Sequence, residues 1–173
     1  MLKKILKIIF TLLLVLLVGL YVVFYTFTAP KSDAKILEAY ESSLIKPELT
    51  KEKYKEFSFR KITIQNDSVL PTLVFVHGTI GSVNDFSKYM SDSLLQTKFN
   101  MIAYDRIGYN YKDENHVQES IAFERDMLLD VIKELNKDKV ILVGYSYGGP
   151  IALSIKEKVK KIILLRRILL HSP

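Results

Sequence analysis

The sequence predicts an α/β fold, a mostly parallel sheet with helices on both faces, preceded by one N-terminal transmembrane helix. Between residues 57 and 165, short apolar runs alternate with segments of helical periodicity. Helices that join parallel strands cover both faces of the sheet, so this alternation favours an α/β domain. An uncharged apolar run of 20 residues, 8–27, precedes it. We therefore expect a membrane signal-anchor over residues 1–30, a helical lead-in or spacer over 31–56, and the α/β domain over 57–173.

The apolar run 8–27 is long enough to cross a bilayer as a helix. At 1.5 Å per residue it reaches about 30 Å, the thickness of the hydrocarbon core. Lys3, Lys4 and Lys7 precede it, so the positive-inside rule predicts a cytoplasmic N-terminus and an extracytoplasmic domain. A cleaved signal peptide is the alternative, but Thr26-Phe27-Thr28 is a poor cleavage site. We expect an uncleaved single-pass anchor.

The elements of the domain follow from periodicity. The lead-in repeats apolar residues at helical spacing and either packs on the domain or acts as a spacer. Ser82 is placed to cap a helix that runs to about Gln96. The other expected helices cover residues 117–136 and the segment that ends at Ile155. Apolar or alternating runs predict five strands, at 57–64, 73–76, 101–104, 140–143 and 161–165.

The stretch from Val140 to Pro150 carries the chemistry. It contains Gly144-Tyr145-Ser146-Tyr147-Gly148 directly after a buried strand and directly before a helix. A nucleophilic serine needs a strained strand-to-helix turn that projects its hydroxyl above the sheet, and small neighbours prevent collisions there. The helix that follows directs its N-terminal N–H groups at a developing oxyanion. Tight packing or a phosphate loop would also use glycine, but the Gly-Lys-Ser/Thr of a Walker loop and a G-x-G-x-x-G are both absent.

Composition excludes several other kinds of site. The chain has no Cys, which rules out disulfides, thiolate metal sites and a cysteine nucleophile. Its three His residues are scattered, so the sequence predicts no metal and no cofactor. The net charge is +6, but most Lys residues alternate with acids and the rest flank apolar segments. We therefore expect membrane association through the N-terminal helix and no nucleic-acid binding.

Two further motifs give the sequence a family resemblance. His77-Gly78-Thr79-Ile80-Gly81-Ser82 follows the first buried strand, and Asp105-Arg106-Ile107-Gly108-Tyr109 follows the second. Together with the serine turn, they make residues 58–165 resemble the α/β-hydrolase family, in its lipase, esterase and C–C hydrolase-like branch. A serine at the turn argues against the haloalkane dehalogenase and epoxide hydrolase branches, which use a carboxylate there.

The resemblance implies a role for each of these residues. Ser146 is expected to be the nucleophile, and the backbone N–H groups of Thr79 and Tyr147 to form the oxyanion hole. His77 is normally structural in the family, and the Asp105-Arg106 pair usually organises the loop beside the site.

The chain departs from the family's pattern after the nucleophile. The family places an Asp or Glu and then a His there. The candidates after Ser146 are Glu157, in the helix that follows the turn and therefore misplaced, and His171 near the end. His116 precedes the nucleophile and is expected at the surface. We therefore expect an α/β-hydrolase domain that is incomplete at its C-terminus, and we hypothesise a truncated or frameshifted reading frame after about Leu165.

Three functions stay open. The first is a membrane-anchored serine hydrolase that cleaves a small-molecule or lipid-like ester, thioester or amide through an acyl-enzyme on Ser146. The second is a catalytically dead remnant or a non-catalytic, membrane-tethered binding module. The third is an assembly that borrows an acid and a His from another chain. Because a serine without a base is a weak nucleophile, the polypeptide as written is expected to be a poor enzyme.

Overall fold

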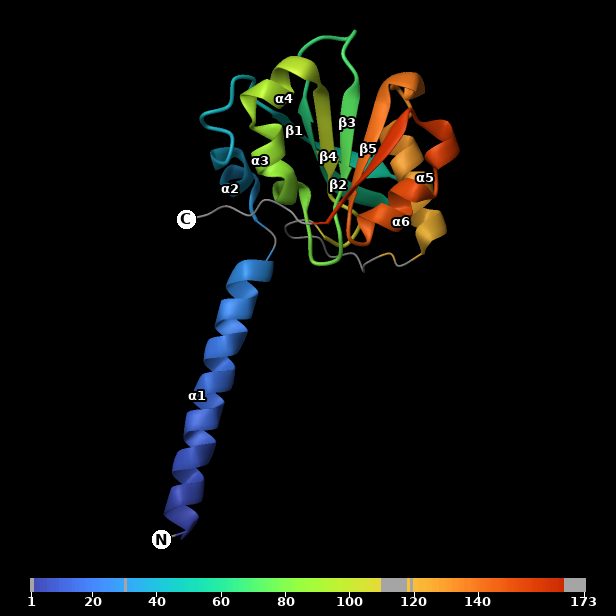
Figure 1. Cartoon of the computed structure of the whole chain (residues 1–173). Helices are drawn as coiled ribbons and strands as arrows, with labels where there is room; N and C mark the ends of the chain where they lie inside the picture. The colour runs from blue at the N-terminus through green and yellow to red at the C-terminus, as the bar shows by residue number, and fades with distance from the viewer. Residues whose placement is uncertain (1, 30, 110–117, 119, 167–173) are drawn as a thin grey trace.

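The structure, a computed structural model, describes residues 2–29, 31–109, 118 and 120–166. It consists of one long helix, α1 (Leu2–Thr28), and an α/β domain that begins directly after it. The domain is a twisted sheet between two layers of helices, and α1 projects away from one end of it (Figure 1).

The sheet has six strands in the order β1-β2-β4-β3-β5-β6. The strands β3, β4, β5 and β6 are parallel, whereas β2 is antiparallel to β4 and β1 is antiparallel to β2. The parallel strands all end at what we call the carboxyl end of the sheet (residues 77–82, 105–109 and 146–147). The opposite, amino end comprises residues 65–71, 100 and 134–139. The strands are β1 (Glu48–Tyr54), β2 (Phe57–Ile64), β3 (Thr72–Val76), β4 (Asn100–Tyr104), β5 (Val140–Tyr145) and β6 (Lys161–Leu165).

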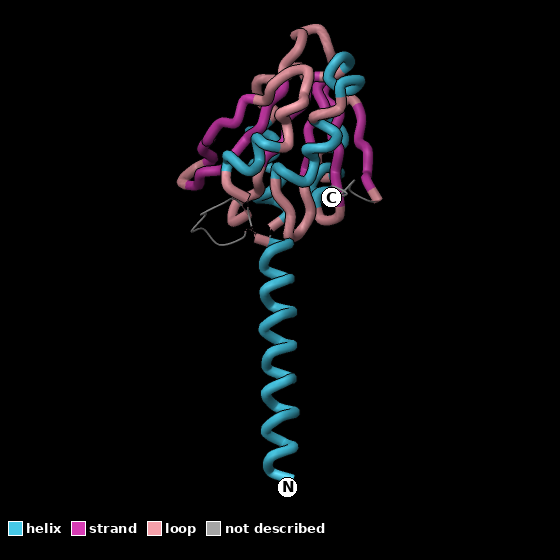
Figure 2. Tube along the Cα trace, turned by 90° about the vertical axis from the view of Figure 1, so that its left-hand side faces the viewer, coloured by secondary structure: helices cyan, strands magenta, loops and turns pink. Residues whose placement is uncertain are grey.

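Helices cover both faces because the buried strands alternate their side chains between two cores. In β3, Val74 and Val76 face one core, and Leu73 and Phe75 face the other. The first core is closed by α5 (Ile121–Val131) and α6 (Gly148–Leu153), and the second by α2 (Asp33–Glu38), η1 (Val83–Phe86) and α3 (Ser87–Met90). Figure 2 shows the same layers from the side. The remaining short helices are α4 (Ser93–Lys98), η2 (Lys137–Lys139) and η3 (Lys156–Lys158).

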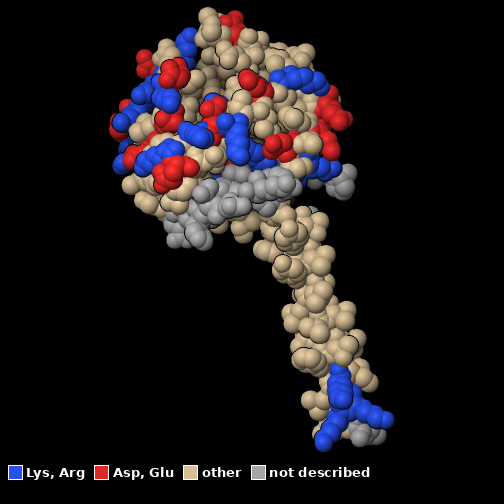
Figure 3. Space-filling view, turned by 180° about the vertical axis from the view of Figure 1, so that it is seen from behind, with Lys and Arg blue, Asp and Glu red and all other residues tan. Residues whose placement is uncertain are grey.

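The helix α1 is apolar along most of its length. Residues Leu2–Thr26 are long and apolar enough to cross a membrane, and none of this segment is buried against the domain. Its charged residues are Lys3, Lys4 and Lys7, which gather at the end far from the domain (Figure 3).

The prediction of a helical lead-in over residues 31–56 is wrong for its second half. Helix α2 covers only Asp33–Glu38, and residues 48–54 form β1, the antiparallel neighbour of β2. The segment is charged and half exposed, as suits an edge strand, so it carries no apolar alternation that would predict pairing. Ile36 and Tyr40 are buried in the core, so this segment packs on the domain and is not a free spacer.

Two predicted helices are shorter than expected. Ser82 caps a helix, as predicted, but the helical stretch stops at Met90 and restarts as α4. The Asp92 side chain accepts a hydrogen bond from the Leu95 N–H at 2.9 Å and starts this new helix. The helix predicted at 117–136 is observed as α5, Ile121–Val131, and part of its predicted start lies outside the described residues.

Candidate active site

Ser146 occupies a strained turn between β5 and α6. Its φ is +50°, in the left-handed region that residues with a side chain rarely adopt. The turn is closed by the Gly149 N–H, which donates to the Ser146 carbonyl oxygen at 2.9 Å. Strain of this kind costs roughly 1–3 kcal/mol and concentrates at functional sites, so this turn is where we look first for chemistry.

Close backbone approach explains why a glycine follows the serine by two residues. A Cβ atom on Gly148 would lie 2.0 Å from the Val76 carbonyl oxygen, closer than any real contact. The first turn of α6 therefore packs directly on the end of β3. This packing fixes the position of Ser146 relative to the loop that follows β3.

The loop after β3 passes directly over Ser146. A Cβ atom on Gly78 would lie 2.8 Å from the Ser146 Cβ and 3.3 Å from its Oγ, so only glycine fits there. Thr79 follows Gly78, and Tyr147 follows Ser146, so the fold brings the two segments predicted to form the oxyanion hole to the same serine. The next residue, Ile80, has a φ of +57° and a side chain that is 62% exposed.

His77 supports this loop with both ring nitrogens. It is fully buried. Its Nδ1 lies 2.8 Å from the Gly78 carbonyl oxygen, to which it donates, and its Nε2 accepts from the Arg106 N–H at 2.9 Å. Burial, reinforced by the charge of Arg106, lowers the pKa of His77 to about 3, so the ring is neutral. A neutral ring with both nitrogens engaged is a structural element and not a base for Ser146.

Arg106 connects the same loop to helix α5. Its Nε bonds the Glu124 carboxylate at 2.8 Å, and its Nη1 donates to the Gly78 carbonyl oxygen at 3.3 Å. Its guanidinium lies over the rings of Tyr109 and Tyr147, 4.7 Å from each centroid. Burial raises the pKa of the Glu124 carboxyl, and the charge and hydrogen bond of Arg106 oppose that rise. We name this set (His77, Arg106 and Glu124) the loop clamp.

Asp105 joins the site to the start of the domain. Its Oδ1 accepts from the Val83 N–H at 2.8 Å, and its Oδ2 accepts from the Arg60 Nε at 2.6 Å. The Arg60 Nη1 in turn donates to the Lys31 carbonyl oxygen at 2.7 Å and to Asp33 at 3.1 Å. The carboxyl of Asp85 lies nearby, and its pKa is raised to about 6, mainly by burial and also by the charge of Asp105.

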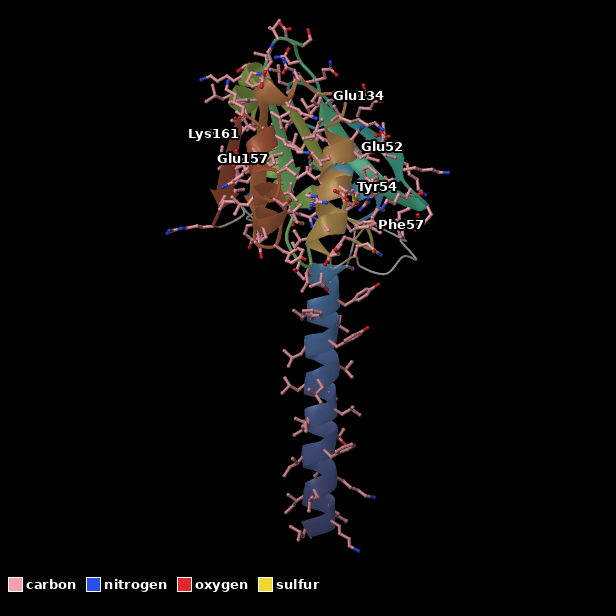
Figure 4. All side chains as sticks on the ribbon, turned by 90° about the vertical axis from the view of Figure 1, so that its right-hand side faces the viewer. Glu52, Tyr54, Phe57, Glu134, Glu157 and Lys161 are labelled. Atoms are coloured by element: carbon pink, nitrogen blue, oxygen red, sulfur yellow. The ribbon has the colours of Figure 1, made fainter. Side chains whose placement is uncertain are left out.

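Glu157 lies away from this site. It follows α6 and pairs with Lys156 at 3.6 Å, with its side chain 86% exposed. Figure 4 shows Glu157 beside Lys161, at the start of β6, far from α1. His116 and His171 lie outside the described residues. Among the residues that the structure describes, no group of three His, Cys, Asp or Glu side chains could hold a metal ion.

Sequence reasoning missed Glu124 and Arg60. Glu124 had a signal, because it shares a helical face with Ile121 and Leu128, and an acid on an apolar face requires a buried partner. Arg60 had none, because a charged residue on a strand next to the edge is ordinarily solvated. A cavity of about 220 Å³ is lined by Gln65, Asn100 and Lys139 among others. It lies at the amino end of the sheet and has no part in this arrangement.

Comparisons with known proteins agree with the fold. The profile of the alpha/beta hydrolase fold matches residues 71–169. The chain is 29% identical over 96 residues to a proline iminopeptidase of Saccharolobus solfataricus and 29% identical over 102 residues to an uncharacterized hydrolase, YugF, of Bacillus subtilis. These matches cover 53% and 54% of this chain but 30% and 36% of the relatives. The chain thus spans about a third of the length of the curated relatives that it matches.

Among solved structures, the carboxylesterase CesB of Bacillus subtilis resembles this chain with a TM-score of 0.56 at 19% identity. The match covers 83% of this chain and 48% of that one. At this identity the likeness shows the fold alone.

Proposed function

Because the chain belongs to the alpha/beta hydrolase fold family, we propose that it carries the nucleophile, Ser146, of a membrane-anchored hydrolase of ester, thioester or amide bonds. One observation carries the proposal: Ser146 has a left-handed φ of +50° between β5 and α6, and its Oγ faces the Gly78 backbone. A serine that served only packing would gain nothing from this strain.

The proposed reaction is acyl transfer through Ser146. The Ser146 Oγ attacks the carbonyl carbon and loses its proton to a His base. The oxyanion is stabilised by the N–H groups of Thr79 and Tyr147. The carbon–heteroatom bond then breaks, and the alcohol, thiol or amine leaves with the proton. Water attacks the acyl-enzyme in the same way and releases the acid. We expect the His and its carboxylate partner to come from outside the described residues.

The loop clamp has a positioning role in this proposal. Because His77 and Arg106 both bond the Gly78 carbonyl oxygen, two buried side chains hold that oxygen in place. The N–H that follows Gly78 along the chain belongs to Thr79. Holding that peptide group in one orientation is what an oxyanion hole requires before the substrate arrives.

The membrane part of the proposal rests on α1. Its Lys residues lie at one end and its apolar segment is long enough to span a bilayer, which supports an uncleaved anchor with a cytoplasmic N-terminus and an extracytoplasmic domain.

A second candidate is a non-catalytic, membrane-tethered module with the same fold. It is favoured by one observation: among the described residues, neither His77 nor Glu157 is placed to activate Ser146.

Fluorophosphonate labelling of native membranes separates these candidates. We expect a labelled band in the wild type that Ser146→Ala abolishes and Ser93→Ala, an exposed serine on α4, leaves intact. Absence of a Ser146-dependent band, with the protein detected by antibody, would refute the hydrolase and favour the non-catalytic module. A band that appears only when another protein is present would favour an assembly that shares its base.

A further inference from the structure

Few residues separate the end of α1 from the first contact within the domain. Helix α1 ends at Thr28, and the Lys31 carbonyl oxygen already accepts a hydrogen bond from the buried Arg60 at 2.7 Å. Three residues span at most about 11 Å when fully extended. If α1 crosses a membrane, the part of the domain around Arg60 therefore lies close to the membrane surface.

That part of the domain is the carboxyl end of the sheet. Arg60 bonds Asp105, which directly follows β4, and the Asp105 N–H donates to the Arg60 carbonyl oxygen at 2.9 Å. Figure 1 shows α1 leaving the domain at this end, where the loop that follows β3 also lies, and Figure 2 shows α1 leaving from the same end of the domain. The amino end, with the loop 65–71, points in the opposite direction.

Ser146 lies at the same end, a short way across the sheet. From β2, which carries Arg60, the order runs through β4 and β3 to β5, which ends just before Ser146. Neighbouring strands are about 4.8 Å apart, so these three steps amount to roughly 14 Å. The first contact after the anchor and the nucleophile therefore lie at the same end of the sheet.

An exposed apolar residue beside the nucleophile fits this placement. Ile80 lies in the loop over Ser146 and is 62% exposed. Val69, at the amino end, is 65% exposed. Exposure alone therefore does not indicate which end faces a membrane, because isolated apolar residues on a surface are ordinary. The short junction carries the argument, and these two residues provide a matched pair of probes for it.

We propose that the carboxyl end of the sheet faces the membrane that α1 crosses, and that Ser146 acts on the acyl ester or amide bond of a lipid in that membrane. This inference rests on the proposed function and names its substrate class. Ser146 forms a bond to the acyl carbon, and the bond to the lipid alcohol or amine breaks. The leaving group departs with the proton, and water then releases the fatty acid. The carbonyl of such a lipid lies just beneath the head groups, on the side that Ser146 faces.

The orientation can be tested without any activity. The chain has no Cys, so Ile80→Cys and Val69→Cys each give one labelling position for an environment-sensitive fluorophore. The full chain is reconstituted in phosphatidylcholine–phosphatidylglycerol vesicles that contain lipids with a quencher on the head group. The two positions differ in height by at least the length of β3, about 16 Å. We expect strong quenching at position 80 and little at position 69. Equal quenching, or stronger quenching at position 69, would overturn the orientation.

The substrate class needs a second measurement. Native protein is treated with a short, water-soluble fluorophosphonate or with a lipid-anchored one in the same vesicles. We expect both probes to label Ser146. A 20-residue Gly-Ser insertion directly after Ala29 should reduce only the reaction with the lipid-anchored probe, severalfold. Labelling by the soluble probe alone would overturn the lipid substrate while leaving the hydrolase intact. If neither probe reacts, the proposed function and with it the lipid substrate are refuted, and the quenching result decides the orientation alone.

Discussion

The two ends of the sheet hold their loops with different chemistry. At the amino end, the neutral amide of Asn100 binds the loop 65–71: its Oδ1 accepts from the Asn66 N–H at 2.8 Å, and its Nδ2 donates to the Asp67 carbonyl oxygen at 2.7 Å. At the carboxyl end, buried ion pairs hold the loops instead. Arg106 pairs with Glu124, and Arg60 pairs with Asp105. Within the described part of the chain, three of the four residues with a left-handed φ, Ile80, Gly108 and Ser146, lie at the carboxyl end, and the fourth, Lys55, lies in the turn between β1 and β2.

The two ends differ in how much their buried groups oppose folding. A neutral amide with its hydrogen bonds made costs little to bury, whereas desolvated ion pairs and left-handed side chains each oppose folding. An end of the sheet that retains such features has been shaped for something besides stability. This difference supports the proposed site at the carboxyl end, although the cavity of about 220 Å³ lies at the other end.

The largest effect should come from breaking the loop clamp. Replacing Arg106 by Leu would leave the buried Glu124 carboxyl without its partner. We expect the free energy of unfolding to fall by about 4 kcal/mol, the usual cost of stranding one member of a buried ion pair. Urea denaturation of the full chain in detergent micelles, followed by circular dichroism, measures this. If the free energy of unfolding falls no further than in Asn100→Ala, a variant of the amino end, the proposed difference between the two ends is contradicted.

The packing of α6 on β3 should give the next largest effect. In Gly148→Ala the new Cβ would meet the Val76 carbonyl oxygen, a backbone atom that cannot move aside alone. We expect a loss of about 3 kcal/mol from overpacking. Gly149→Ala is the matched control in the same turn, because its Cβ would lie 3.4 Å from the flexible Leu164 side chain. It should be neutral or stabilising, since Ala favours a helix over Gly by about 1 kcal/mol. Equal losses in both variants would show that this close approach does not exist.

The amino end should be more tolerant. Asn100→Ala removes the amide that binds the loop 65–71, and we expect a loss of about 2 kcal/mol from the backbone groups left unpaired. Because this end is not part of the proposed site, labelling of Ser146 by a soluble fluorophosphonate should be unchanged. Loss of labelling in a folded Asn100→Ala protein would show that the two ends are coupled.

The last expected effect depends on pH, because two groups at the carboxyl end act in opposite directions. His77 has its pKa lowered to about 3, so its contribution to stability is present above pH 6.5 and is lost as the pH falls towards 3. Asp85 has its pKa raised to about 6, so the folded state gains stability as the pH falls through 6. In Asp85→Asn the opposing contribution of Asp85 is removed, so the free energy of unfolding should fall more steeply below pH 6 than in the wild type, by about 1 kcal/mol more per pH unit. Urea midpoints of wild type and variant between pH 7 and 4 measure this, and parallel curves would contradict it.

Local patterns predicted much of the fold. The prediction of a mostly parallel sheet between helices is confirmed, and the apolar run 161–165 forms β6 with the predicted bounds. The strand 48–54 was missed because its charged sequence has no alternation of apolar and polar residues. Only its pairing with β2 identifies it as a strand. Helix ends moved where a side-chain cap such as that of Asp92 outweighed the longer periodicity.

The sequence by itself determined five of the six strands, the turn at Ser146 and the apolar length of α1, because each depends on residues that are neighbours in the chain. Only the tertiary structure decided that Gly78 lies on Ser146, that Glu124 holds Arg106, and that Arg60 binds the Lys31 carbonyl oxygen beside the carboxyl end. These contacts join residues far apart in sequence, and burial determines which pairs form, since a charge removed from water must find its partner within the fold.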